Sequence, residues 1–294
     1  MDALKLKVWA ASARPKTLAA GVAPVIVGGA MAYADGYFHA GVLAVTLVAA
    51  VLIQIGTNLA NDYYDYVQGA DTADRVGPVR ATQAGLVRPG EMRLAFVLTF
   101  GAAVVAGIYL AARGGVPILI IGAASIVCAV LYTAGPFPLG YVGLGEAFVL
   151  PFFGPVAVGG TYYLQTGGIN ADVLIAGLGC GLLSVAILAV NNFRDIETDR
   201  AAGKKTLAVR FGYGFGVVEY IVCVVLACLT PVFLCAARGA NCRGCLAVLT
   251  LAAAVFPIRT IVRRPAPEVL NRVLAQTGGL LLLYSILFSI GWLI

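Results

Sequence analysis

Residues 40–71 read AGVLAVTLVAAVLIQIGTNLANDYYDYVQGAD, and this stretch decides the fold. Its first part, 40–60, is an almost unbroken run of apolar residues. Such a run is long enough to cross the roughly 30 Å hydrocarbon core of a bilayer as a helix. Its second part is rich in carboxylate, amide and tyrosine side chains. The stretch therefore predicts a membrane-spanning helix that ends in a polar, acid-bearing segment.

The rest of the chain has the same apolar character. Of its 294 residues, 61% are hydrophobic and 12% are charged, and the mean hydropathy is +0.93. Soluble domains carry about 45–50% apolar and about 25% charged residues, so this composition excludes a soluble globular protein. The sequence lacks the alternating segments of about 10 residues that are typical of membrane β-barrels. We therefore predict an all-α, polytopic integral membrane protein.

The apolar runs divide the sequence into candidate spans. Each run has roughly the length that a transmembrane helix needs, and polar segments separate them. No stretch has the composition of a separate soluble domain, so we expect residues 1–294 to form a single transmembrane domain. We predict nine spans, at residues 17–34, 40–60, 93–112, 115–134, 143–163, 171–193, 214–237, 245–262 and 273–294.

The basic residues are distributed unevenly between the two sides of these spans. The N-terminus and the segments after the second, sixth and eighth spans hold every Lys and Arg except Arg113, Arg238 and Arg243. The positive-inside rule then places the N-terminus and these segments in the cytoplasm. Basic loops beside anionic lipid account for the net charge of +6, so we expect no nucleic-acid partner.

Carboxylates are concentrated in two short segments on the basic side of the predicted membrane. The first runs from Asn58 to Asp74, and the second runs from Asn191 to Asp199. If each helix continues past its span, residues three and four apart share a face. One stripe would then carry Asn58, Asp62 and Asp65. The other would carry Asn191, Asp195 and Asp199.

These residue types in this order point to a metal-diphosphate site. Carboxylates that face one another repel unless a cation lies between them, and hard oxygen ligands suit Mg²⁺ bridged to phosphate oxygens. Basic side chains follow each cluster and can neutralise the charge of a departing diphosphate. We expect the diphosphate to contact Arg75, Arg80, Lys204, Lys205, Arg210, Asn58, Asn61 and Asn191. The alternative is that these are ordinary polar helix ends that meet water.

The two acidic segments resemble the paired aspartate-rich motifs of the UbiA-type intramembrane prenyltransferases. Residues 61–71 are similar to the first family motif, Asn-Asp-x-x-Asp-x-x-x-Asp, but Gly69 stands at its last position and Asp71 follows two residues later. Residues 195–199 match the second motif, Asp-x-x-x-Asp. The Gly69-x-Asp71 variant, the opening at 14–18 and the segment 203–207 resemble the branch of the family that makes menaquinone precursors.

The resemblance implies an activity as well as a fold. The helices would form a bundle around a central cavity, in a bacterial inner (plasma) membrane. The reaction would be the Mg²⁺-dependent transfer of a polyprenyl group from polyprenyl diphosphate to 1,4-dihydroxy-2-naphthoate, with loss of CO₂, giving demethylmenaquinone. The family's catalytic carboxylates would be Asp62, Asp65, Asp195 and Asp199. Its metal ligands would be Asn61, Asp62, Asp65, Asp71, Asp195 and Asp199.

Candidate acceptor residues lie near both ends of this region. Arg14 and Lys16 are either interfacial anchors or partners of the carboxylate of an aromatic acid. Tyr63 and Tyr64 fall inside the first motif, where aromatic faces can stabilise a carbocation, although packing is an equally simple role. We therefore name these four residues as candidates for acceptor binding.

Other functions are compatible with parts of the pattern. Intramembrane carboxylates also occur in cation-coupled transporters, although transporter sites lie near the bilayer midplane rather than at span ends beside basic loops. A purely structural membrane subunit would leave the clustered carboxylates unexplained. Within the prenyltransferases, 4-hydroxybenzoate, homogentisate, haem or a glycerol phosphate are alternative acceptors.

The seven cysteines form no zinc pattern. Cys242 and Cys245 have the spacing of a redox or metal pair, but no second pair accompanies them. We expect either a loop disulfide or two plain thiols on the side opposite the acidic segments. The other five cysteines fall within spans and are expected to serve as small packing residues.

Overall fold

The computed structural model describes the chain except for residues 1–2, 71–75, 78, 239–241 and 243. The described residues form helices and connecting loops without any strand. The all-α class predicted from composition is confirmed. The elements are α1 (Ala3–Ser12), η1 (Pro15–Thr17), α2 (Ala19–Ala34), α3 (Ala40–Val67), α4 (Pro89–Leu131), α5 (Gly145–Pro151), η2 (Phe152–Val156), α6 (Ala157–Thr166), α7 (Ala171–Arg194), α8 (Ile196–Ala201), α9 (Leu207–Phe211), α10 (Tyr213–Arg238), η3 (Cys245–Leu249), α11 (Thr250–Val262) and α12 (Pro267–Leu293).

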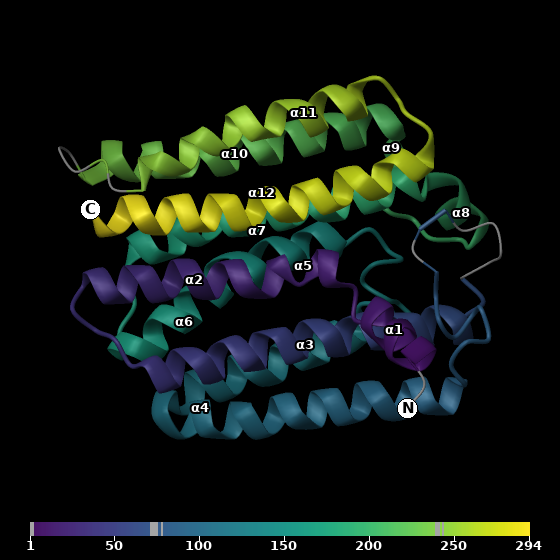
Figure 1. Cartoon of the computed structure of the whole chain (residues 1–294), viewed down its shortest axis with the longest axis horizontal. Helices are drawn as coiled ribbons and strands as arrows, with labels where there is room; N and C mark the ends of the chain where they lie inside the picture. The colour runs from purple at the N-terminus through teal and green to yellow at the C-terminus, as the bar shows by residue number, and fades with distance from the viewer. Residues whose placement is uncertain (1–2, 71–75, 78, 239–241, 243) are drawn as a thin grey trace.

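The long helices lie side by side in a bundle (Figure 1). The helix α7 is central. In its 18-residue apolar stretch 72% of the residues are buried, whereas in that of α4 only 6% are buried. It packs on α10, α12 and η2, while α3 packs on α4 and α2 packs on α12. Exposed apolar side chains such as Leu98 and Val105 cover α4, as expected for a helix surface that faces lipid.

The helix α4 doubles back on itself. At about 1.5 Å per residue its 43 residues would extend about twice the thickness of a bilayer core. Gly115 breaks the helix with a φ of 70° and a ψ of −158°. Phe96 and Ala129 belong to one buried cluster, and Leu110 and Ile118 belong to another, so the two halves run alongside each other. The predicted span 93–112 and most of the predicted span 115–134 therefore fall within this one element, which ends at Leu131.

Counting spans by length and hydropathy gives a smaller number than the sequence predicts. Seven of the described helices are long and apolar enough to cross a membrane, or eight if the bent pair Leu4–Thr17 and Ala19–Ala34 is one span. The predicted count of nine is therefore not confirmed. This criterion counts α4 once, although it contains two predicted spans.

Close helix contacts are built on glycine. Gly154, Gly177 and Gly181 bring η2 against α7 so tightly that their backbones touch. Such small residues let helices approach in a bilayer, where apolar lipid removes the usual hydrophobic drive for association. This contact fixes the broken span α5–η2–α6 against the central helix, and with it the segment just before α5.

The substitution Gly177→Ala is expected to destabilise the protein by about 1–3 kcal/mol. A Cβ at this position would lie 2.7 Å from the Cα of Pro155 and 2.8 Å from its nitrogen, backbone atoms that no rotamer change can move. The control is Gly101→Ala in α4, where nothing lies within 4 Å of the added Cβ. Thermal unfolding in detergent, followed by circular dichroism, measures both variants. Equal midpoints for the two would contradict this packing.

Candidate active site

The first acidic motif lies on the last turns of α3, which continues past its apolar part to Val67 as predicted. Asp62 and Asp65 are both 2% exposed. Asp62 accepts the backbone N–H groups of Ala81 and Thr82, each at 3.0 Å. Its carboxylate therefore caps the turn that follows Arg80 and holds that turn against α3.

Asp65 is the meeting point of three segments. Its carboxylate accepts hydrogen bonds from Arg80 Nη2 at 2.5 Å and from the Tyr141 hydroxyl at 2.6 Å, and Lys204 Nζ lies 3.4 Å away. Lys204 also lies 4.5 Å from the centroid of the Tyr141 ring, within cation–π distance. A buried carboxylate is stable only with such partners, because its desolvation is costly. The two carboxylate oxygens of Asp65 are thus surrounded by the side chains of Arg80, Tyr141 and Lys204.

The second acidic motif departs from the predicted continuous helix. The helix α7 ends at Arg194, and Asp195 is the junction with the short helix α8. The Asp195 N–H still donates to the Asn191 carbonyl at 3.2 Å and the Asp199 N–H to the Asp195 carbonyl at 2.8 Å, so the four-residue spacing of the predicted stripe continues across the junction. The Arg194 guanidinium binds both oxygens of Asp195, at 2.7 and 2.5 Å. It also donates to Asn191 Oδ1 at 2.7 Å. This adjacent, buried ion pair holds the chain where the helix breaks.

The polar network of the second motif reaches the first loop through α12. Arg194 Nη1 donates to Asn271 Oδ1 at 2.9 Å, and Asn271 Nδ2 donates to the Val76 carbonyl at 3.1 Å. One amide of α12 therefore links the end of α7 to the loop that follows the first motif. Asn271 is not among the predicted site residues. The signal for it in the sequence is an amide just before the last predicted span, on the basic side.

Lys204 joins the two motifs. Its ammonium lies 3.4 Å from Asp65 Oδ1 and 3.5 Å from Asp199 Oδ1, and all three side chains are largely buried. The loop that carries Lys204 is fastened from the other side, since Lys205 N–H donates to the Tyr141 carbonyl at 2.7 Å. Gly143 permits this contact, because a Cβ there would lie 2.7 Å from the Lys205 carbonyl oxygen. The structure thus brings carboxylates from both motifs to one cation.

A second tyrosine lies among these carboxylates. Tyr132 is half-buried, and its hydroxyl lies near enough to Glu146, Asp199 and Asp65 to interact with the charges of all three. A phenol hydroxyl can donate a hydrogen bond to a carboxylate. Gly140 and Gly145 make room for it, since a Cβ at either position would lie within 3 Å of Tyr132 side-chain atoms.

The predicted amide ligands have partners within the protein. Asn61 Oδ1 accepts from the Thr133 hydroxyl at 2.9 Å. Asn58 Nδ2 donates to the Ala13 carbonyl at 2.9 Å and to the Thr17 hydroxyl at 3.1 Å. Asn58 therefore anchors the N-terminal turn to α3, one helical turn before Asp62.

That N-terminal turn carries two of the candidate acceptor residues. Arg14 adopts a left-handed backbone conformation with a φ of 51°, and its carbonyl accepts from the Thr17 hydroxyl. Lys16 is exposed and lines a pocket of about 350 Å³ between the turn, α2 and α12. A second pocket, of about 270 Å³, lies between α1 and the start of α4. None of the motif carboxylates lines either pocket.

The other candidates lie at the edge of this cluster. Tyr63 and Tyr64 are half-buried, and their rings pack against each other and against Phe96 of α4. Lys205 and Arg210 are exposed, and the Arg210 guanidinium donates to the carbonyls of Lys205 and Val142. The last two predicted site residues, Asp71 and Arg75, lie outside the described residues.

A divalent cation has suitable ligands at this site. Among the described residues no three carboxylates lie within 4.8 Å of one another, but Asp65 and Asp199 already share a cation, the Lys204 ammonium. Their carboxylate oxygens are the hard ligands that such ions prefer. Asp62 and Asp195 belong to the same two motifs. Asp62 accepts hydrogen bonds from backbone N–H groups and Asp195 from the Arg194 guanidinium. The arrangement fits a metal that would enter between the motifs as the basic side chains move to a phosphate.

Known proteins resemble this chain over nearly its whole length. The sequence pattern of the UbiA prenyltransferase family matches residues 21–289. The 1,4-dihydroxy-2-naphthoate octaprenyltransferase of Haemophilus influenzae is 38% identical, over 99% of this chain and 97% of its own. The protein of the same name from Escherichia coli is 37% identical, over 98% and 95%.

Solved structures share the fold at lower identity. A UbiA homolog from Archaeoglobus fulgidus bound to GPP and Mg²⁺ superposes with a TM-score of 0.70 at 14% identity, covering 98% of this chain and all of the other. The same fold therefore occurs in a protein that was crystallised with a prenyl diphosphate and a divalent metal. With its apolar helices and these matches, the chain is an integral membrane protein that belongs to the UbiA prenyltransferase family.

Proposed function

We propose that this protein transfers a polyprenyl group from polyprenyl diphosphate to 1,4-dihydroxy-2-naphthoate, with loss of CO₂, in the synthesis of demethylmenaquinone. Two bacterial relatives that match almost the full chain carry the name of that activity. The comparisons do not favour the transporter alternative or another acceptor. The whole chain, 1–294, would act as one domain.

The observation that carries the proposal is the position of Lys204. A buried ammonium between Asp65 and Asp199 lies where a metal-diphosphate complex would have to bind both motifs. Asp65 also binds Arg80, so two basic side chains, Arg80 and Lys204, contact the carboxylate that a metal would need. Substrate binding would exchange these partners, with Lys204 and Arg80 passing to phosphate oxygens and the carboxylates to the metal.

Mg²⁺ is the metal we propose, held by Asp65 and Asp199 with Asp62, Asp195 and Asn61 beside them. When bound, it would neutralise negative charge on the leaving diphosphate. Asp71, Arg75, Lys205 and Arg210 remain candidates for the rim of this site. The amides of Asn58 and Asn191 would position the motifs, since both already bind protein groups.

The residues of the chain can assist each stage of the transfer. When the carbon–oxygen bond of the prenyl diphosphate breaks, Lys204 and Arg80 would stabilise the negative charge on the phosphate. The rings of Tyr141 and Tyr132 would face the allylic cation, which a site shielded by apolar helices protects from water. The naphthoate ring then forms the new carbon–carbon bond at the carbon that bears its carboxylate. Because CO₂ leaves in place of a proton, no base is needed to restore the aromatic ring.

The acceptor would enter beside the N-terminal turn. Arg14 and Lys16 are our candidates for its carboxylate, because Asn58 fastens their turn to α3 one helical turn from Asp62. Tyr63 and Tyr64 are weaker candidates, since their rings contact Phe96. We further propose that this end of the bundle faces the cytoplasm of a bacterial cell, as the basic residues predict.

A prenyl-transfer assay on the purified protein in detergent tests the proposal. Farnesyl diphosphate, Mg²⁺ and naphthoate labelled in its carboxyl group are expected to give a prenylated product and labelled CO₂ in equal amounts. EDTA is expected to stop the reaction, and 4-hydroxybenzoate is expected to give no product. A product from 4-hydroxybenzoate alone would keep the chemistry and discard the acceptor. If the folded protein consumes no prenyl diphosphate with any acceptor, the proposal is wrong.

A further inference from the structure

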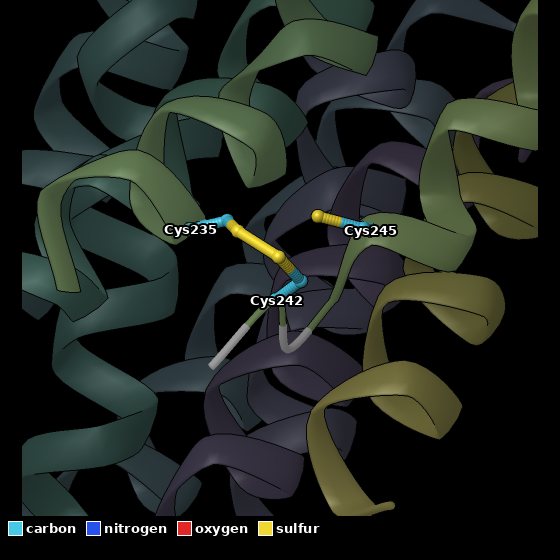
Figure 2. Close-up of side chains that lie close together, drawn as sticks. All are labelled: Cys235, Cys242 and Cys245. Carbon is cyan, nitrogen blue, oxygen red and sulfur yellow. A yellow bond between two sulfur atoms is a disulfide. The ribbon is translucent and has the colours of Figure 1, made fainter. Parts of the chain in front are cut away.

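Three cysteine sulfurs meet at one end of the bundle. Cys235 lies near the end of α10, Cys242 lies in the loop that follows, and Cys245 begins η3 (Figure 2). Cys235 and Cys242 form a disulfide, and all three Sγ atoms lie within 4.8 Å of one another. The expected packing role of Cys235 is therefore wrong, and Cys242 pairs with it rather than with Cys245.

The third thiol is held in place beside the disulfide. Cys245 Sγ donates to the Pro231 carbonyl at 3.5 Å. Gly244, with a φ of 80°, lies so close to α12 that a Cβ on it would be 2.8 Å from the Phe288 ring. A Cβ on Gly291 would likewise lie 3.2 Å from the Gly244 Cα. The backbone before Cys245 is thus packed against α12, and its sulfur stays near the pair.

This cluster is separate from the site proposed for prenyl transfer. The helix α10 runs from Tyr213, near the acidic motifs, to the cysteine end, a length of about 39 Å at 1.5 Å per residue. Figure 1 places α8 and α9 at one end of the bundle, and α10 runs from that end to the other. The sulfurs therefore lie far from the acidic motifs.

We propose that Cys235, Cys242 and Cys245 form a thiol–disulfide exchange site that reacts with small thiols. The exposed Cys242 is the point of attack. A thiolate of the external compound attacks Cys242 Sγ, forming a mixed disulfide and releasing Cys235 as a thiol after it takes up a proton. Cys245 then attacks the same sulfur, forming a Cys242–Cys245 disulfide and releasing the external thiol. Sulfur and electrons balance in both steps without an added oxidant.

The exchange changes what the disulfide connects. In the first pairing the loop is tied to α10, and in the second it is tied to η3 and leaves Cys235 free. Exchange needs an attacking thiolate and direct access to the sulfur, and the cluster supplies both a neighbouring thiol and an exposed target. The buried thiols of Cys180, Cys223 and Cys228 belong to no such group among the described residues.

Mass spectrometry of the full-length protein in detergent tests this site. The protein is incubated with reduced glutathione and no other reductant, and samples are quenched with acid, alkylated and digested. In the unmodified sequence we expect both the Cys235–Cys242 and Cys242–Cys245 peptides, with little glutathione adduct. In Cys245→Ser the second pairing is lost, and the adduct on Cys242 is expected to rise at least severalfold. Cys228→Ser is the matched control and should behave as the unmodified sequence does.

Two results would overturn the proposal. One is a single pairing in the unmodified protein at every thiol concentration, with Cys245 fully alkylated. The other is a reduced protein that retains stoichiometric Zn²⁺ and protects all three cysteines from alkylation, which would identify a metal site instead. Both are read on the unmodified sequence, so a variant that fails to fold leaves the test intact. Neither depends on prenyl transfer.

Discussion

Asp65→Asn is expected to lower the rate of prenyl transfer about a thousandfold or more. The amide keeps the size of the side chain and can still accept from Tyr141. It cannot balance the charges of Arg80 and Lys204, which both contact the Asp65 carboxylate. It also removes an anionic ligand that a divalent cation requires. Initial rates at saturating Mg²⁺ and both substrates measure the effect.

The control for charge removal is Glu197→Gln. Glu197 lies in the second motif between Asp195 and Asp199, but its side chain is 84% exposed and pairs only with the exposed Arg200 among the described ion pairs. We expect it to retain most of the activity, because an exposed pair contributes little. A rate for Asp65→Asn close to that of Glu197→Gln would remove Asp65 from the mechanism.

Loss of stability could imitate loss of catalysis at this position, and a double variant separates the two. Removing one partner of a buried ion pair costs about 3–5 kcal/mol, because the other charge is left without compensation. Asp65→Asn with Arg80→Gln removes one of those charges, so its unfolding midpoint should recover part of the loss. Its activity should not recover. A double variant that regains both would show that Asp65 acts only in folding.

The sequence predicted the parts of this protein that depend on local pattern. Apolar runs of membrane length gave the all-α class and the helix that continues through Asp65. The placement of both acidic motifs at one end of the bundle followed from counting spans, and the structure joins them through Lys204. These features depend on the length and order of segments, which a single sequence contains.

Features that depend on long-range packing were not predictable. Tyr141 is 76 residues from Asp65 in sequence, and Asn271 is 77 residues from Arg194. No periodicity connects such pairs. The break of α7 at Arg194 is a different case, because the residues that pair there, Arg194 and Asp195, are adjacent in sequence. A rule that continues every helix past its span cannot detect that.

The two carboxylates of the first motif, Asp62 and Asp65, bind different kinds of partner, which their spacing alone does not reveal. Asp62 and Asp65 lie one turn apart on the same buried face of α3. Asp62 binds two backbone N–H groups of the loop, whereas Asp65 binds side chains that carry charge. One carboxylate therefore positions the loop that brings Arg80, and the other holds the exchangeable cations. A comparison with the family motif alone would assign the same role to both carboxylates.

Lys204→Gln is expected to lower the rate of transfer by about a hundredfold to a thousandfold, the cost of losing one donor to a developing anion. Because Lys204 bridges Asp65 and Asp199, its loss also leaves these carboxylates less well balanced. They should then bind a divalent cation in the absence of substrate more tightly than the unmodified protein does. The variant would thus combine a low rate with stronger metal binding, a pairing that general misfolding does not produce.

Arg200→Gln provides the matched control, since it removes a basic charge from α8, where Arg200 is exposed and pairs with Glu197. Its rate and its affinity for Mg²⁺ should stay within about twofold of the unmodified protein, as expected for a surface ion pair. Isothermal titration with Mg²⁺ and initial rates measure both variants. If Lys204→Gln loses activity while its affinity for Mg²⁺ falls, Lys204 does not compete with the metal. The partner exchange proposed for this site would then be wrong, even though the residue is needed.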